Sequence, residues 1–103
     1  MATSILAPAQ TAGNSSNITV GDDEQVVIAL YTTTGVDVPP GPALGLQRQD
    51  INGNFITVAT AGYGQIFLSR GCQQLVLTTP GVYRVVRPDI TAWLTDIGVQ
   101  QGL

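Results

Sequence analysis

The sequence contains neither lysine nor histidine, and its four cations are all arginines: Arg48, Arg70, Arg84 and Arg87. Binding along a nucleic-acid backbone needs clustered Lys and Arg. The net charge is −3, so nucleic acid is not an expected partner. Without histidine, the commonest general base and metal ligand near neutral pH is missing. The composition therefore favours a protein that is not an enzyme and holds no metal or cofactor.

Cysteine occurs once, at Cys72, so no intramolecular disulfide can form and nothing indicates secretion. With no histidine to activate it, Cys72 is expected to be a small, partly buried residue rather than a nucleophile. No apolar stretch is long enough to span a membrane. The first ten residues also lack the basic start and long apolar core of a signal peptide, so no membrane partner is expected.

Charge of either sign is scarce, since only 11% of the residues are charged and 44% are hydrophobic. A soluble domain normally carries about a quarter charged residues. Two interpretations follow. Much of the surface is covered in an oligomer or lattice, or the chain is a β protein that stays soluble through Thr, Gln and Asn.

Residues 1–17 are rich in Ala, Ser, Thr, Asn and Gln and show no alternation or helical spacing. They predict an extended N-terminal arm outside the core, with the folded domain over residues 18–103. Ile5, Leu6 and Pro8 are its candidate contacts with a neighbouring molecule. Removing the arm is expected to weaken binding to that neighbour while leaving the fold intact.

Short alternating segments predict β-strands through the rest of the chain. Residues 25–33 are apolar on both faces, which predicts a central strand or one covered by a partner. Asn52-Gly53 predicts a hairpin turn, because such turns require positive φ. The remaining strands are expected at residues 18–20, 44–49, 55–60, 65–69, 73–78, 82–87 and 91–99. The last segment also fits a helix, but Gly98 and its β-branched residues favour a strand that buries Trp93.

Three prolines, Pro39, Pro40 and Pro42, lie in one loop after residue 33. They predict a semi-rigid segment, which is either a stiff crossover between sheets or a contact loop. A second loop holds Asp22, Asp23 and Glu24. Adjacent carboxylates lack the alternating spacing of a calcium loop, so a solvated turn is expected there. All other acids except Asp96 also fall in predicted turns or strand ends, where Asp caps backbone amides rather than forming a catalytic pair.

Residues 78–88, TTPGVYRVVRP, predict a turn at Pro80-Gly81 followed by a strand that ends before a proline. Alternation places Arg84 and Arg87 on opposite faces, so they cannot line one groove. Together with the other strands, this pattern predicts an all-β fold: a single small β-sandwich, Ig-like or jelly-roll-like. Tyr83 lies where the Tyr of Ig-like sandwiches bonds back to the backbone.

The segments LQRQDINGNF and PGVYRVVRP, behind a neutral N-terminal segment, resemble a series found in small virion proteins of tailed bacteriophages. Such proteins include capsid decoration, or cement, proteins. The resemblance implies a homotrimeric structural protein that binds the major capsid protein lattice on the virion surface after assembly in the host cytoplasm. It carries over no catalytic residue. Arg84 and Arg87 are candidate partner contacts, through salt bridges to Asp89 or to another subunit.

Two other functions stay open. The chain could be a phage tail or fibre module, or a carbohydrate-binding β-sandwich in which exposed aromatic rings stack on sugars. Tyr31, Tyr63 and Trp93 are the aromatic candidates for this role, and core packing is the alternative for Trp93.

Overall fold

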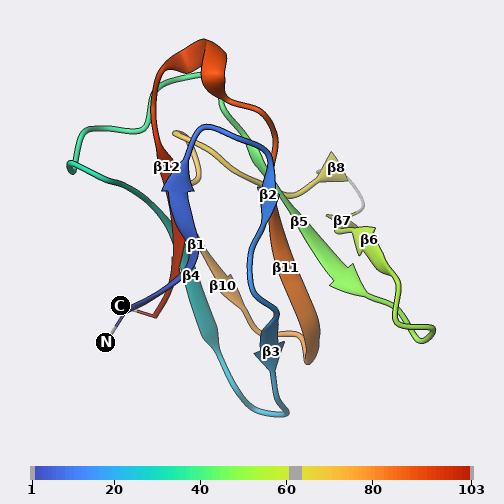
Figure 1. Cartoon of the computed structure of the whole chain (residues 1–103). Helices are drawn as coiled ribbons and strands as arrows, with labels where there is room; N and C mark the ends of the chain where they lie inside the picture. Colours follow the sequence, from blue (N-terminus) through green and yellow to red (C-terminus); the bar gives the residue numbers. More distant parts are fainter. Residues whose placement is uncertain (1, 61–63, 103) are drawn as a thin grey trace.

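The computed structural model describes residues 2–60 and 64–102, which form a sandwich of two antiparallel sheets (Figure 1). Sheet A has the strand order β1-β12-β4-β10, and sheet B has the order β2-β11-β5-β6, with β3 also pairing with β11 and β9 with β5. The predicted fold class, a single small all-β sandwich, is confirmed. The elements are β1 (Thr3–Ala9), β2 (Gly13–Asn14), β3 (Ile18–Val20), β4 (Val26–Thr32), β5 (Leu44–Gln49), β6 (Phe55–Thr57), β7 (Ala59–Thr60), β8 (Gly64–Gln65), β9 (Phe67–Leu68), β10 (Gln74–Leu77), β11 (Gly81–Arg87), the 3₁₀ helix η1 (Thr91–Trp93) and β12 (Ile97–Gln101).

The core lies between the two sheets and is built from alternate residues of the longer strands. In β11, Tyr83 and Val85 point inward, whereas Arg84 and Val86 are only half-buried on the outer side. β4 supplies Val26, Ile28 and Leu30 from the opposite sheet. Burial of these aliphatic side chains provides most of the driving force for folding, at about 25 cal/mol per Å² of apolar surface.

Three local predictions are confirmed. The two-faced apolar segment is β4, which lies inside sheet A between β12 and β10. The Asn52-Gly53 turn joins β5 to β6, with Gly53 at φ 85°. Asp50 holds that turn, because its Oδ1 accepts the backbone N–H groups of Asn52 and Asn54, each at 2.9 Å. The proline-rich loop crosses from sheet A to sheet B between β4 and β5.

The N-terminal segment differs from the expected arm. β1 forms an edge of sheet A and pairs with β12, while β2 pairs with β11 in sheet B (Figure 1). The segment has no alternation because β1 changes register twice against β12, between Ser4 and Leu6 and between Leu6 and Ala9. These irregularities allow both Ile5 and Leu6 to pack against the core.

The prediction of a strand over residues 91–99 is wrong for residues 91–96. Residues 91–93 form η1, which ends at Leu94 in a left-handed conformation with φ 53°. The backbone N–H and hydroxyl of Thr91 both donate to Oδ1 of Asp89, at 3.0 and 2.7 Å. This local Asx turn competes with strand geometry, so β12 begins only at Ile97.

The expected strands over residues 55–60 and 65–69 are each divided into two shorter strands. Leu46 in β5 causes the division, because its carbonyl accepts the N–H of Val58 and its N–H donates to the carbonyl of Ile66. Val58 and Ile66 also bond to each other at 3.0 Å, and beyond them β7 and β8 form a separate small ladder. No helix in the described ranges has the length and apolarity needed to cross a membrane.

Candidate functional site

The outer face of sheet B carries almost no charge. The strand register places the neighbouring pairs Arg84–Gln47, Gln47–Thr57 and Val86–Gly45 on this face, away from the core. Among the described strand residues of this face, Arg84 is the charged one. The outward positions are Asn14, Thr19, Gly45, Gln47, Gln49, Phe55, Thr57, Phe67, Val82, Arg84 and Val86.

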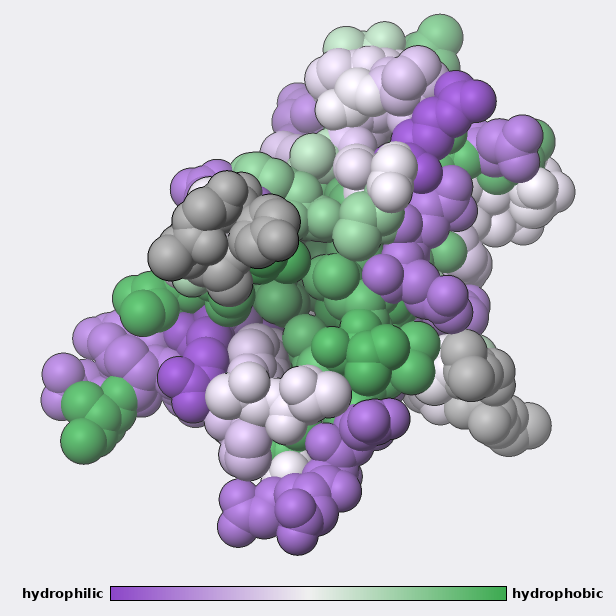
Figure 2. Space-filling model, turned by 180° about the vertical axis from the view of Figure 1, so that it is seen from behind, coloured by the Kyte–Doolittle hydropathy of each residue, from purple (hydrophilic) through white to green (hydrophobic). Residues whose placement is uncertain are grey.

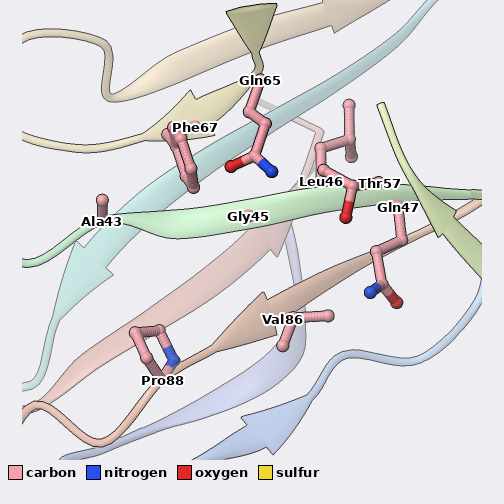
Figure 3. A pocket seen from close by; sticks show the side chains of 9 residues that line it. All are labelled: Ala43, Gly45, Leu46, Gln47, Thr57, Gln65, Phe67, Val86 and Pro88. Carbon is pink, nitrogen blue, oxygen red and sulfur yellow. The ribbon is translucent and has the colours of Figure 1, made fainter. Parts of the chain in front are cut away.

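A shallow groove of about 210 Å³ crosses this face between β9, β5 and β11. Figure 3 shows Phe67 and Gln65 on one side of β5 and Val86 and Pro88 on the other. Gly45 forms the floor, where an added Cβ would lie 3.8 Å from the Phe67 ring. The residues that line the groove are Ala43, Gly45, Leu46, Gln47, Thr57, Gln65, Phe67, Val86 and Pro88. None of these side chains is ionisable, so the groove is suited to binding rather than to proton transfer.

Arg84 is held in one orientation at the Gln47 end of this groove. Its Nε donates to Oε1 of Gln47 at 2.7 Å, and its guanidinium carbon lies 4.2 Å from the centre of the Phe55 ring. The ring stabilises the cation by a cation–π interaction, and the bond to Gln47 limits its rotamers. A guanidinium positioned in this way can donate its remaining N–H groups to carbonyl or carboxylate oxygens of a partner.

Arg87 was expected to contact a partner, but the structure places it inside the sandwich. The prediction that Arg84 and Arg87 lie on opposite faces is confirmed, and Arg87 is only 4% exposed. Its Nε donates to the carbonyl of Thr11 at 2.6 Å, and its Nη1 donates to the carbonyls of Ala7 and Ile97, both at 2.8 Å. Arg87 therefore joins β11 of sheet B to the N-terminal segment and β12 of sheet A.

Burial shifts the ionisation of Arg87, although it stays charged. Desolvation lowers the pKa of Arg87, and the negative charge of Asp96 raises it in opposition. Asp96 therefore acts on Arg87 through electrostatic attraction. Asp89 does not pair with Arg84, which bonds to Gln47 instead. The hydrogen bonds from the backbone and side chain of Thr91 lower the pKa of Asp89.

The other predicted contact residues are distributed over different parts of the molecule. Ile5 and Leu6 are half-buried against the core, and Pro8 lies close to Gly98 of β12. These contacts correct the expectation that residues 1–17 can be removed without harm, since their loss would expose Arg87 and one edge of β12. In the proline-rich loop, Pro40 is exposed, Pro39 is half-buried and Pro42 is buried, so Pro42 stiffens the crossover rather than meeting a partner.

The aromatic candidates do not form one surface. Trp93 is 42% exposed, which corrects the expectation of core packing, and its ring lies over Gly41. The hydroxyl of Tyr31, on the outer face of sheet A, bonds to Oγ of Ser4 at 2.6 Å. Tyr63 lies outside the described residues. Trp93 is therefore the more exposed of the two described candidates.

Sequence reasoning missed the groove, although it found part of its floor. The alternation of residues 44–49 indicated that Gly45, Gln47 and Gln49 share a face. The positions of Phe67 and Val86 depend on the pairing of β5 with β9 and β11, which join distant parts of the chain. No local pattern shows these contacts.

Comparison with known proteins shows similarity to a solved structure but not to a known sequence family. No protein-family model matches the sequence, and neither does any curated protein. Among solved structures, the SPBc2 prophage-derived protein YomS is similar, with a TM-score of 0.59 over 98% of this chain and 88% of that chain. The two sequences are 9% identical, so the likeness shows that this chain shares the fold of YomS.

Proposed function

We propose that the chain is a structural protein of a bacteriophage particle that decorates the head by binding the major capsid protein lattice. The observation that carries the proposal is the neutral outer face of sheet B, where a wide surface holds a groove and one positioned cation. The fold of the prophage-derived YomS supports a phage origin. The resemblance of LQRQDINGNF and PGVYRVVRP to phage virion proteins supports the same assignment.

Binding would rest on apolar contact with a few directed hydrogen bonds. Phe67, Val86 and Pro88 offer apolar surface, while Gln47 and Arg84 offer polar groups in fixed positions. The affinity of such a face for a partner depends little on long-range electrostatic attraction and mainly on shape complementarity. Many copies on one lattice turn weak single contacts into stable decoration through avidity, and an oligomer such as the trimer implied by the resemblance would add to this effect.

The test is binding of the purified protein to capsids that lack it. Phe67 is 41% exposed, so Phe67→Glu places a charge in the groove without disturbing the core, and it should weaken binding at least about tenfold. Ile51→Glu is the matched control, because it adds the same charge at a side chain that is 99% exposed on the hairpin turn. The proposal is wrong if the unaltered protein leaves such capsids bare, or if Phe67→Glu binds as well as Ile51→Glu.

One observation favours a second function, a carbohydrate-binding module of a tail or fibre. The exposed Trp93 on η1 presents a ring of the kind that stacks on sugars. A glycan array separates the two functions. A hit that Trp93→Ala abolishes would favour the carbohydrate module, and an array without hits would remove it.

A further inference from the structure

We infer that β10 is a self-association edge, at which two copies of this chain pair their β10 strands antiparallel. β10 is the last strand of sheet A on the side opposite β1. It pairs with β4 through four consecutive residue pairs without a register shift. The other side of its backbone faces no strand in the described part of the chain, although the carbonyl of Gln74 accepts a weak bond from Sγ of Cys72 at 3.7 Å. This straight ladder is a template for another strand.

The two edges of sheet A differ in protection. β1 contains Pro8 and changes register twice against β12, features that prevent further strand addition. β10, with the sequence QLVL, has no proline, no charged residue and no bulge. A free edge strand usually carries a lysine or a proline, or is covered by a helix or loop. β10 has no such lysine or proline, which fits a strand that pairs with a partner.

A second groove runs along this edge. It has a volume of about 230 Å³ and lies where the two sheets separate, lined by Leu46, Val58, Ile66, Leu75, Val76, Leu77, Thr78, Thr79 and Tyr83. No lining residue is charged at neutral pH, and Val76 is 56% exposed. Seen from behind, the molecule shows an apolar patch across the middle of this face (Figure 2), and β10 lies on that side of the molecule (Figure 1).

The edge is self-complementary in charge, which suits pairing with a second copy of the chain. Antiparallel pairing of identical strands is two-fold symmetric, so any charge on the strand would lie near its own equivalent and repel it. Residues 73–80, QQLVLTTP, contain no charge, so self-pairing meets no such repulsion. A second copy also brings an identical groove. When the two β10 strands pair, each molecule covers the exposed Val76 of the other.

This pairing has a defined geometry and stoichiometry. Two four-stranded sheets would join into one sheet of about eight strands, held by backbone hydrogen bonds between the paired β10 strands. The contact is isologous and closes with two copies. It therefore predicts a dimer in place of the trimer implied by the resemblance, and it needs no capsid, since its surface differs from the groove on sheet B.

The first experiment measures the mass of the full chain in solution by light scattering. The unaltered protein should be a dimer, and Val76→Lys should dissociate at least about tenfold more readily, because it places two like charges across the symmetry axis. Ile51→Lys makes the same charge change on the hairpin turn and should leave the dimer unchanged. A monomer or trimer for the unaltered chain, or a Val76→Lys variant as dimeric as Ile51→Lys, would overturn the inference.

A second measurement locates the contact. Cys72, the sole cysteine, lies two residues before β10, so a spin label there reports the distance between copies. With the symmetry axis near Leu75 and Val76, the two labels should be about 20–30 Å apart, at about 3.4 Å per residue along each strand. A dimer whose labels lie well beyond that range uses another surface and refutes the pairing. If Val76→Lys monomers still bind capsids, the proposed capsid binding does not depend on the β10 dimer.

Discussion

At the scale of single residues, Arg87 has the largest structural role of any charged side chain in the strands. Its guanidinium satisfies carbonyls from Ala7, Thr11 and Ile97, and these carbonyls belong to the N-terminal segment and to β12. Because burial of a charge is unfavourable unless it is hydrogen-bonded, the arrangement works only while all the elements are in place. Arg87 therefore couples the N-terminal segment to the rest of the fold.

Replacing Arg87 with Met should lower the free energy of unfolding by about 3 kcal/mol, since buried carbonyls lose charge-assisted hydrogen bonds. Urea denaturation measures this difference. Arg70→Met, at an exposed position, removes the same charge and should change stability by less than about 0.5 kcal/mol. Equal stabilities for the two variants would show that the hydrogen bonds of Arg87 contribute no more than an exposed arginine does.

Tyr83 shows which residue contacts can be predicted from sequence. Its hydroxyl donates to the carbonyl of Thr79 at 2.7 Å, as the position after Pro80-Gly81 suggested. Arg48 adds to the same turn by donating to the carbonyl of Pro80 at 3.0 Å, with its guanidinium 6.0 Å from the Tyr83 ring. The Tyr83 bond spans four residues and was expected from the likeness of its position to the Tyr of Ig-like sandwiches. The contact of Arg48 required knowledge that β5 lies beside β11.

At the scale of elements, β1 illustrates how a strand can lack the pattern of a strand. Its place on the edge of sheet A depends on Gly98, where an added Cβ would lie 2.6 Å from the carbonyl oxygen of Leu6 and 2.9 Å from the nitrogen of Pro8. The close approach of the two backbones adds to the packing of Ile5 and Leu6 on the core. Local composition alone indicated an arm.

Gly98→Ala should push β1 away from β12 and reduce stability by about 1–3 kcal/mol. Hydrogen exchange should rise in residues 3–9, while the amides of β4 that pair with β10 keep their protection. Gly45→Ala serves as the control, because its Cβ would meet the Phe67 ring at an ordinary 3.8 Å. If β1 exchanges no faster in Gly98→Ala than in Gly45→Ala, the close approach does not hold β1 in place.

The elements that were predictable share one property, which is that the signal lies in their own residues. β4 is apolar on both faces, β11 alternates, and the β5–β6 hairpin contains the Asn52-Gly53 turn. The division into β7, β8 and β9 has no such signal, because it results from hydrogen bonds of Leu46 to Val58 and Ile66. The candidate site follows the same rule: Arg84 was identified from β11 alone, but the groove beside it needs β9 and β5 together.

At the scale of the whole molecule, the two signs of charge are separated by structure. All seven acidic residues lie in turns and loops, at Asp22, Asp23, Glu24, Asp37, Asp50, Asp89 and Asp96. The strands carry only arginines, and these bond to neutral groups: Arg48 to Pro80, Arg84 to Gln47 and Arg87 to three carbonyls. Both sheet faces thus stay nearly uncharged, while the turns provide the net charge of −3 that favours solubility.

This separation predicts that stability and self-association depend little on ionic strength. Salt screens pairs of exposed charges, with a Debye length of about 3 Å at 1 M, but the hydrogen bonds of these arginines are to uncharged partners. The melting temperature at pH 7 should therefore shift by less than about 3 °C between dilute buffer and about 1 M NaCl, a change well below 1 kcal/mol for a domain of this size. The dimer should persist in the same salt, because burial of the apolar groove beside β10 is not weakened by screening. A fall of many degrees, or release of monomers by salt, would mean that ion pairs rather than neutral contacts hold the fold or the assembly. In that case, protein-contact surfaces would not explain the low charge of the chain.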